Sequence, residues 1–439
     1  MNASRPIRRV LIVSPSFPPI NAPDMQRVRM SLPYYRENGW EPIVLAVDPA
    51  SHSGIQEVEL LATVPADIVI HRCRAFSAKW SRRFGVGNLG LRSWLQLFFA
   101  GRRIIKRENI DLVFFSNTQF VTFTLGRIWR RLYGVRYVID LQDPWRTDYY
   151  RGARKKDRPG GWKYAFATMQ AGILEGWSFK RMSGLISVSQ HYLESLRHSY
   201  PWFSAVPTDV IGFGASETDL TVAAKKTSGS SLHTVATVRI VYTGVAGSVM
   251  QPALTVLFDG LHAFRLRNPT TNRLRFDFLG TSYAAANTAR PSVSPVAYQF
   301  ATDDLVSETP VRLGHIEALR EQSAADALLL LGTDDPAYSP SKLYPYYLSG
   351  RPLLAIVAKG SYLEQLLREL SCAAIVTFDP SGPNEQTQEQ LAEFFRAALG
   401  GFPHGSLPVR NDMLFRNQYL AGSLTRRQCA IFDQAFPTI

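Results

Sequence analysis

The sequence reads Tyr338-Ser-Pro-Ser-Lys-Leu-Tyr-Pro-Tyr-Tyr-Leu-Ser-Gly-Arg-Pro352 between two short apolar runs, at residues 327–331 and 353–357. Both runs are too short to be helices of their own and are typical of buried strands in a parallel sheet. Between them we predict a helix with Ser341 as its N-cap and Gly350 at its end, because glycine accepts the left-handed cap conformation and the following proline cannot continue a helix. The stretch therefore predicts a strand–loop–helix–strand unit, the repeating element of an α/β fold.

The start of this predicted helix has the features of an anion-binding site. Free backbone N–H groups, the Ser341 hydroxyl and the Lys342 cation come together near the carboxyl end of a parallel strand. A diphosphate suits such a site. The alternative is an ordinary crossover with a solvated lysine, which a Ser-Lys pair by itself does not exclude.

Composition indicates a globular chain with two domains. The chain has 439 residues, of which 46% are hydrophobic and 19% charged, and two cores of about 200 residues each are expected at this length. No apolar run approaches the roughly 20 residues of a membrane span, and the short apolar run at residues 10–13 predicts a first strand and not a signal peptide. Three scattered cysteines indicate a reducing cytoplasm, with no disulfide framework and no zinc site.

The positive charge is concentrated in the first half of the chain. Residues 1–230 carry a net charge of +14 and residues 231–439 a net charge of −1. Such a basic surface can attract an anionic membrane, a phosphorylated acceptor or nucleic acid. No helix-turn-helix, zinc-finger or RNP-type motif is present, so we expect no nucleic-acid partner. A soluble and merely basic domain is the remaining alternative.

The amino-terminal residues predict the opening of a Rossmann-like domain. A strand at residues 8–15 leads into a loop at residues 16–23, and Asp24 can cap the helix that follows to Arg36. No G-x-G-x-x-G pattern is present, so a dinucleotide cofactor is not indicated. The predicted helix at residues 91–107 ends in four basic residues and is either a core helix or a membrane-surface helix.

Two further positions suggest chemistry. Asp143 lies just past the predicted strand at residues 136–141, where open α/β sheets place their ligands, and it could orient or deprotonate an acceptor hydroxyl or only cap a turn. In the second half, Gly244 and Gly247 bracket a strand-to-helix turn whose N–H groups could meet phosphate oxygens.

Three segments, residues 10–27, 139–146 and 338–352, resemble those of family-4-like GT-B glycosyltransferases. The resemblance implies an α/β fold of two Rossmann-like, doubly wound domains that face each other across a cleft. The expected parts are an acceptor-side domain at 1–220, a linker at 221–237, a donor-binding domain at 238–411 and a final helix at 412–439 that crosses back to the first domain.

The resemblance also implies a function. We expect a retaining, metal-independent transfer of sugar from a nucleotide-sugar to an acceptor hydroxyl in cell-envelope or exopolysaccharide assembly. No cofactor is expected, and the expected acceptor is a saccharide or a lipid-linked molecule. We expect a cytoplasmic protein with a possible contact to the inner face of an anionic membrane. The expected catalytic residue is Asp143; the expected donor-binding residues are Gly244, Gly247, Asp335, Ser341, Lys342 and Tyr346, and those on the acceptor side or in the cleft are Asn21, Arg27 and Arg146.

The sequence departs from the family pattern in two places. Asn21-Ala22-Pro23 stand where the family has loop glycines, and Ala337 and Pro345 stand at the positions of a glutamate pair that binds sugar and ribose hydroxyls. Asp334 or Asp335 could replace the first glutamate, and Tyr346 could contact the nucleotide. The alternative is a catalytically silent GT-B scaffold that binds a nucleotide or a partner.

Overall fold

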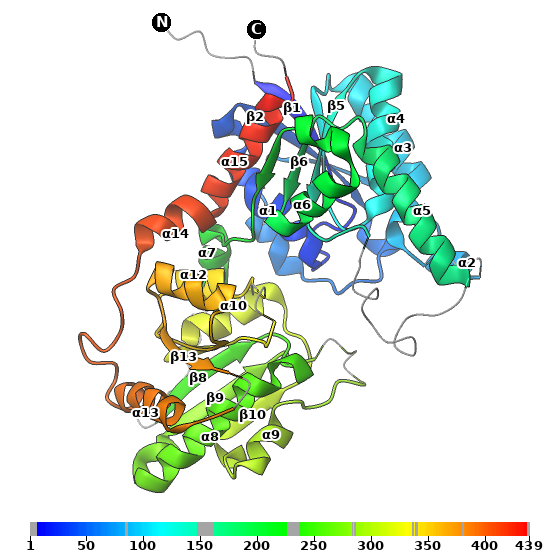
Figure 1. The fold of residues 1–439 in the computed structure, drawn as a ribbon. Helices are drawn as coiled ribbons and strands as arrows, with labels where there is room; N and C mark the ends of the chain where they lie inside the picture. The colour runs from blue at the N-terminus through cyan, green and yellow to red at the C-terminus, as the bar shows by residue number, and fades with distance from the viewer. Residues whose placement is uncertain are drawn as a thin grey trace, which may run out of the picture. The chain divides into compact units, whose positions relative to one another are not determined.

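A computed structural model describes residues 7–83, 87–146, 162–225, 237–282, 284, 287–335, 338, 341–379 and 382–436, with the side chains of Arg82 and of 162–170 excepted. The chain divides into two compact units. Unit 1 comprises residues 1–213 and 421–439, and unit 2 comprises residues 214–420. Figure 1 traces both units along the chain.

Unit 1 is built on a seven-stranded, wholly parallel sheet. Its spatial order is β3-β2-β1-β4-β5-β6-β7, which reverses direction between β1 and β4 as in a doubly wound fold. The strands are β1 (Arg8–Val13), β2 (Trp40–Val47), β3 (Val69–Cys73), β4 (Leu112–Ser116), β5 (Arg136–Leu141), β6 (Gly184–Ser187) and β7 (Thr208–Val210).

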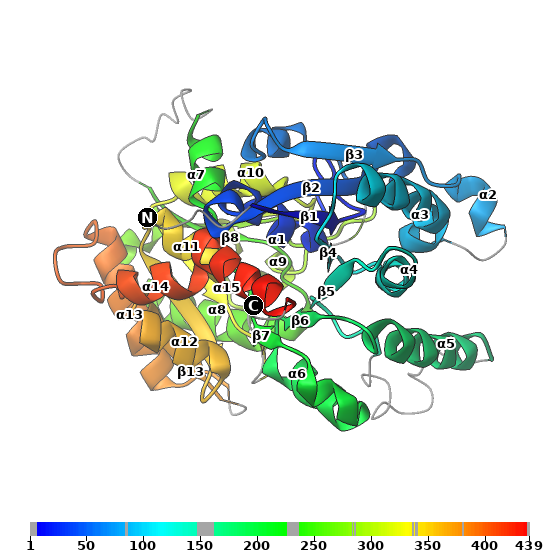
Figure 2. The ribbon, with the colours of Figure 1, turned by 90° about the horizontal axis from the view of Figure 1, so that it is seen from above.

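Helices cover both faces of this sheet (Figure 2). Helices α3, α4 and α6 pack on one face, and α1 and α15 pack on the other. The helices of unit 1 are α1 (Gln26–Ser31), α2 (Ala78–Arg82), α3 (Leu89–Arg107), α4 (Phe123–Tyr133), α5 (Trp162–Phe179), α6 (Gln190–Ser199) and α15 (Ala421–Gln434). Short 3-10 turns are η1 (Pro23–Met25), η2 (Leu32–Tyr34), η3 (Arg36–Asn38), η4 (Pro49–Ser51), η5 (Val58–Thr63), η6 (Phe120–Thr122) and η8 (Pro201–Ala205).

Unit 2 repeats the plan with six parallel strands. The order is β10-β9-β8-β11-β12-β13, and it reverses between β8 and β11. The strands are β8 (Val238–Thr243), β9 (Leu274–Leu279), β10 (Val306–Thr309), β11 (Ala327–Leu331), β12 (Leu353–Ala358) and β13 (Ala374–Phe378).

The helices of unit 2 also form two layers. One core cluster takes in α8, α9 and α13, and the other takes in α11 and α12. The helices are α7 (Glu217–Ala224), α8 (Gln251–Arg267), α9 (Ser294–Gln299), α10 (His315–Ala324), α11 (Leu343–Ser349), α12 (Tyr362–Leu370), α13 (Glu385–Leu399) and α14 (Asp412–Tyr419), with 3-10 turns η9 (Ser248–Met250), η10 (Pro269–Arg273) and η11 (Asp303–Leu305). The predicted α/β fold with two doubly wound domains is confirmed.

The domain boundary differs from the expected one. Helix α7 belongs to unit 2, because Asp219 forms an ion pair with His315 of α10 at 2.8 Å and Arg320 of α10 donates to the carbonyl of Ala223. The expected linker begins at residue 221. In the structure, residues 221–224 instead form the end of the packed helix α7. Of the expected linker, residues 226–236 lie outside the described part of the chain.

The expected final helix is two helices. It breaks at Leu420, which has extended backbone angles, so α14 lies in unit 2 and α15 in unit 1. In unit 1, Arg427 of α15 donates to the Asp209 carboxylate at 2.6 and 3.0 Å. In the structure the chain returns to unit 1 after Leu420, with a break that the helical pattern did not show.

The close approach of α3 to α4 depends on a glycine. A methyl group built at Gly101 would lie 2.3 Å from Cζ2 of Trp129, a fully buried side chain. We expect Gly101→Ala to lower the free energy of unfolding by about 1–3 kcal/mol, because the indole has no free space into which it can move. Gly212→Ala is the control, since no atom lies within 4 Å of the added carbon there. Equal urea midpoints for the two variants would contradict this packing.

Candidate functional site

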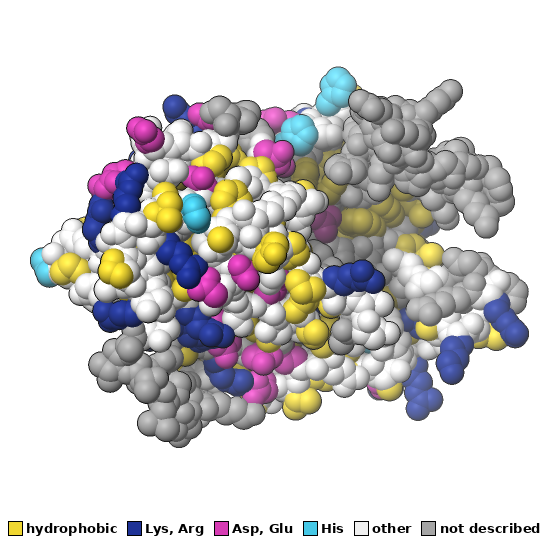
Figure 3. All heavy atoms as spheres, turned by 90° about the horizontal axis from the view of Figure 1, so that it is seen from below, with side chains coloured by type: hydrophobic (Ala, Val, Ile, Leu, Met, Phe, Trp, Pro, Cys, Tyr) yellow, Lys and Arg dark blue, Asp and Glu magenta, His cyan; other side chains and the backbone are white. Residues whose placement is uncertain are grey.

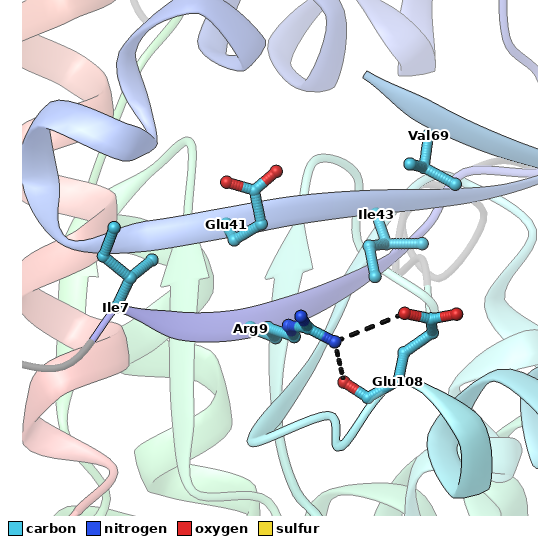
Figure 4. Close-up of a pocket in the computed structure, with 6 residues that line it drawn as sticks. All are labelled: Ile7, Arg9, Glu41, Ile43, Val69 and Glu108. Atoms are coloured by element: carbon cyan, nitrogen blue, oxygen red, sulfur yellow. Dashed lines mark hydrogen bonds and ion pairs between the residues drawn. The ribbon is translucent and has the colours of Figure 1, made fainter. Parts of the chain in front are cut away.

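A pocket lies at the amino ends of the first three strands (Figure 4). It is lined by Ile7, Arg9, Glu41, Ile43, Val69 and Glu108. Arg9 Nη1 is held by the backbone oxygen of Glu108 at 2.8 Å and by its carboxylate at 3.3 Å. In doubly wound sheets ligands bind at the carboxyl ends of the strands, so the expected site lies at the edge opposite to this pocket.

The carboxyl edge of the unit 1 sheet holds a buried ion pair. Asp140, near the end of β5, is buried, and its Oδ2 lies 2.8 Å from Nε of Arg27. The Ser116 hydroxyl of β4 donates to the same oxygen at 2.7 Å, and Arg27 Nη2 also donates to the carbonyl of Ile211 at 2.6 Å. The structure thus places Arg27, an expected cleft residue, inside the protein with its charge matched by Asp140.

Gln142 connects this ion pair to the amino-terminal loop. Its amide nitrogen donates to Asp140 Oδ2 at 3.1 Å and to the Asp24 carbonyl at 3.0 Å. Asp24 is itself buried, and its carboxylate accepts hydrogen bonds from the backbone N–H and the hydroxyl of Thr118 at 3.3 and 3.1 Å. Asp24 therefore does not cap a helix as the sequence suggested, since η1 begins after Ala22 without a side-chain cap.

Asp143 is the exposed carboxylate at this edge. It follows Gln142 directly, and the described residues offer its side chain no hydrogen bond or ion pair. Partial burial and the negative charge of Asp24 raise the pKa of Asp143. A raised pKa makes an exposed carboxylate a stronger base, which suits it to accept a proton from a hydroxyl.

The two other expected acceptor-side residues are held at separate places in unit 1. The Asn21 amide donates to Glu57 at 2.8 Å, and Arg146 lies 3.8 Å from the carboxylate of Glu175. Glu175 also accepts from the hydroxyl of Tyr200 at 2.9 Å. The structure does not bring Asn21 into contact with Asp143.

In unit 2 the carboxyl edge of the sheet holds a half-buried lysine. Nζ of Lys342 donates to the hydroxyl of Tyr242 at 2.6 Å and lies 4.1 Å from the centre of its ring. Burial lowers the pKa of Lys342 from 10.5 to about 7. Because the described residues supply no carboxylate partner, this amine holds a proton only weakly at neutral pH.

The glycine turn leaves the space that the lysine occupies. Gly244 has φ of +109°, and a methyl group built there would lie 3.0 Å from Nζ of Lys342. The Tyr242 hydroxyl donates in turn to the carbonyl of Val245 at 2.6 Å, so the lysine and the turn are linked through one side chain. The N–H of Gly244 already donates to Leu279, and the space around Gly247 is open.

The remaining expected donor-side residues differ in exposure. Tyr346 is buried, and its hydroxyl accepts a hydrogen bond from the N–H of Thr243 at 2.8 Å. This side chain is therefore part of the core of unit 2. Burial raises the pKa of Tyr346 to about 12. Asp335 and Ser341 are exposed. The expected N-cap role of Ser341 is wrong, because α11 begins after Lys342 without a side-chain cap; Pro345 then lies inside this short helix.

Neither a metal site nor a membrane span is found in the described part of the chain. No three His, Cys, Asp or Glu side chains in that part converge in an arrangement that could hold a metal ion. Among the same residues, no helix is both long and apolar enough to cross a membrane.

Comparisons with known proteins concern the fold and one part of the chain. The family model described as "Glycosyl transferase 4-like domain" matches residues 26–214, which include Arg27, Asp140 and Asp143. A comparison with curated protein sequences found no significant match.

Solved structures match over almost the whole chain. The N-terminal domain of trehalose-6-phosphate phosphatase from Candida albicans superposes with a TM-score of 0.58 at 12% identity, covering 98% of this chain and 97% of that one. A glycosyltransferase from Rickettsia africae superposes with a TM-score of 0.51 at 13% identity, covering 98% of this chain and 98% of that one. HepE from Anabaena, in complex with UDP and glucose, superposes with a TM-score of 0.50 at 13% identity, covering 98% of this chain and 97% of that one. These likenesses show the fold.

The chain therefore has a GT-B fold. Residues 26–214, which form most of unit 1, match the family model of the glycosyl transferase 4-like domain.

Sequence reasoning missed part of the site. The sequence pattern predicts a helix cap at Asp24 and indicates no role for the side chains of Asp140 and Tyr242. The signal available for Asp140 was a carboxylate inside an otherwise apolar strand, which requires a buried partner. Nothing in the local sequence indicated that Tyr242 receives a lysine from 100 residues further along the chain.

The half-buried lysine makes unit 2 more stable at alkaline pH. The folded-state pKa of Lys342 lies below its unfolded value, so between about pH 7 and 10.5 the unfolded chain binds more protons and the free energy of unfolding rises with pH. We expect a slope of up to about 1.4 kcal/mol per pH unit, which Lys342→Met removes. The measurement is urea unfolding from pH 7 to 10, with the exposed Lys359→Met as control. An unchanged slope in Lys342→Met would contradict the burial of the charge.

Proposed function

We propose that the chain is a glycosyltransferase that moves a sugar from a nucleotide-sugar donor to an acceptor hydroxyl. The observation that carries the proposal is Asp143, an exposed carboxylate with a raised pKa at the carboxyl end of β5, inside the glycosyl transferase 4-like domain. In this proposal Asp143 orients the acceptor hydroxyl and accepts its proton.

The donor diphosphate is proposed to bind at the carboxyl edge of the unit 2 sheet. Lys342, the Gly244–Gly247 turn and the exposed Ser341 lie there. An arriving diphosphate would raise the pKa of Lys342, so that the amine becomes a full cation facing the phosphates. The structural neighbour HepE was solved with UDP and glucose, which supports a nucleotide-sugar as the donor class.

The proposed reaction balances without a further reactant. The bond between the sugar and the diphosphate breaks, the acceptor oxygen forms a bond to the sugar, and the hydroxyl proton goes to Asp143. The leaving diphosphate takes the electron pair, and Lys342 and backbone N–H groups stabilise its charge. We propose retention of configuration, no metal ion and no cofactor, and a role in cell-envelope or exopolysaccharide assembly, as the resemblance implies.

A catalytically silent scaffold is the second candidate. Pro345 cannot supply the hydroxyl-binding carboxylate of the family pattern, and Lys342 is already satisfied by Tyr242. Ala337, at the other glutamate position, lies outside the described residues. Such a protein would bind a nucleotide without turnover.

Substitutions in the two units separate the two candidates. Asp143→Asn should keep the affinity for a nucleoside diphosphate and abolish sugar transfer, because unit 1 is proposed to serve the acceptor. Lys342→Ala should weaken diphosphate binding by about 1.5–3 kcal/mol, the value of a charge-assisted hydrogen bond. The measurements are calorimetric titration with UDP, GDP, ADP and dTDP and a transfer assay with the corresponding sugars.

Two results would contradict these assignments. A loss of diphosphate affinity in Asp143→Asn would remove its acceptor-side role, and unchanged affinity in Lys342→Ala would remove the lysine from the donor site. Diphosphate binding without any transfer or hydrolysis would favour the silent scaffold.

We further propose that α3 holds the protein on an anionic membrane and presents it to a lipid-linked acceptor. Leu91, Leu95 and Phe99 are spaced by four residues, so they share one face of the helix, and they are 47%, 46% and 56% exposed. The helix contains no acidic residue, and its last two turns expose Arg102, Arg103, Lys106 and Arg107.

A neighbouring turn extends this apolar face. Phe76 is exposed and is held beside α3 by hydrogen bonds between its backbone and Arg92, at 3.0 and 2.7 Å. Figure 3 shows the molecule from below, and on that face the Lys and Arg side chains are scattered among acidic and apolar side chains. Apolar residues followed by a cationic end are typical of a helix that lies in the interface of an anionic bilayer.

Vesicle co-sedimentation tests this contact. We expect binding to vesicles that contain an anionic lipid, release at raised salt, and no binding to neutral vesicles, since each basic residue near such a surface contributes about 1 kcal/mol. Leu95→Glu should lower the bound fraction at least about fivefold. Leu266→Glu, at an exposed leucine of α8 in unit 2, is the control. Equal and negligible binding to both vesicle types would exclude the membrane contact.

A further inference from the structure

Asp24 is a buried carboxylate whose charge the surrounding residues do not neutralise. Its oxygen accepts from the N–H and hydroxyl of Thr118, and the Ser16 hydroxyl is a further donor. Within the described ranges no Lys or Arg forms an ion pair with it. Desolvation raises the pKa of Asp24, while these donors lower it, so the anion is held by dipoles alone.

The base next to Asp24 is neutral. His52 Nδ1 accepts a hydrogen bond from the N–H of Gly54 at 2.8 Å, so a neutral ring carries its proton on Nε2, 3.2 Å from the Ser16 hydroxyl. Burial lowers the pKa of His52. The ring can therefore donate to Ser16, and Ser16 to Asp24, without bringing a positive charge.

The arginines nearby are occupied elsewhere. Arg92 of α3 donates to the carbonyls of Phe76 and Ser51, and Arg27 of α1 is paired with Asp140. Asp143 follows Gln142 directly, and the Gln142 amide donates to the backbone carbonyl of Asp24. The residues Asp24 and Asp143 therefore lie near each other at the carboxyl edge of the unit 1 sheet, the first buried and the second exposed.

We propose that Asp24 is a positioning residue for Asp143, a fixed negative charge that makes the exposed carboxylate a stronger base for the acceptor hydroxyl. Its role in turnover rests on the proposed function, but the charge pair itself does not. A nearby negative charge disfavours the ionised form of a carboxylate, and the charge of Asp24 acts on Asp143 in this direction. A base works best when its pKa approaches the working pH. Burial raises the pKa of Tyr192 of α6, and the negative charge of Asp143 adds to this rise.

A double-mutant cycle tests the charge pair without an activity measurement. Asp24→Asn, Asp143→Asn and the double variant are compared by their thermal unfolding midpoints at pH 7. We expect the midpoint of the double variant to rise by less than the sum of the two single rises, because either substitution removes the same repulsion. Asp67→Asn, which changes the net charge equally at an exposed site, should be additive with Asp143→Asn. Additive shifts for Asp24→Asn would overturn the proposal.

The pH dependence of turnover tests the consequence. We expect the acidic limb of kcat/KM to move about one pH unit lower in Asp24→Asn, since loss of a like charge lowers the pKa of Asp143. Asp67→Asn should leave the limb unchanged. A lower rate with an unmoved limb would mean a structural role only and would overturn the proposal. If the wild-type chain transfers no sugar, the proposed function fails while the double-mutant cycle still decides the charge pair.

Discussion

The ion pair between Arg27 and Asp140 sets the arrangement of the carboxyl edge in unit 1. Both side chains are buried, and a buried charge without a partner would cost several kcal/mol, so each residue constrains the other. Through Ser116, Gln142 and the Ile211 carbonyl, this pair connects α1 with the ends of β4, β5 and β7. The loop that carries Asp143 begins at this network, which is why an exposed catalytic candidate can have a defined place.

Unit 2 meets the same problem of a buried charge in another way. Lys342 has no buried carboxylate among its described contacts, and its stability in the core comes from the hydroxyl and ring of Tyr242 and from a lowered pKa. A paired charge, as in unit 1, is held permanently and favours a rigid frame. A weakly protonated amine can instead gain its charge when an anion binds near it.

Much of the fold could be predicted from the sequence because the strands are signalled locally. Runs such as 327–331 and 353–357 are apolar throughout. Parallel strands that are covered by helices on both faces need apolar side chains on both faces. Glycine and proline near residue 350 marked the end of α11, where Gly350 adopts φ of +71°. The boundary between the units could not be found in this way. Helix α7 has a polar composition and joins unit 2 through contacts with α10, almost 100 residues away.

The site divides along the same line. The sequence by itself determined that Asp143 follows a strand of an α/β sheet and that a lysine stands near the start of α11, because both depend on neighbours in the chain. Only the tertiary structure decided that Asp24 is buried near Asp143, that Arg27 is neutralised by Asp140 and that Lys342 lies against Tyr242. Protonation and charge depend on burial and on partners from distant segments, and a local pattern of residues carries neither of these.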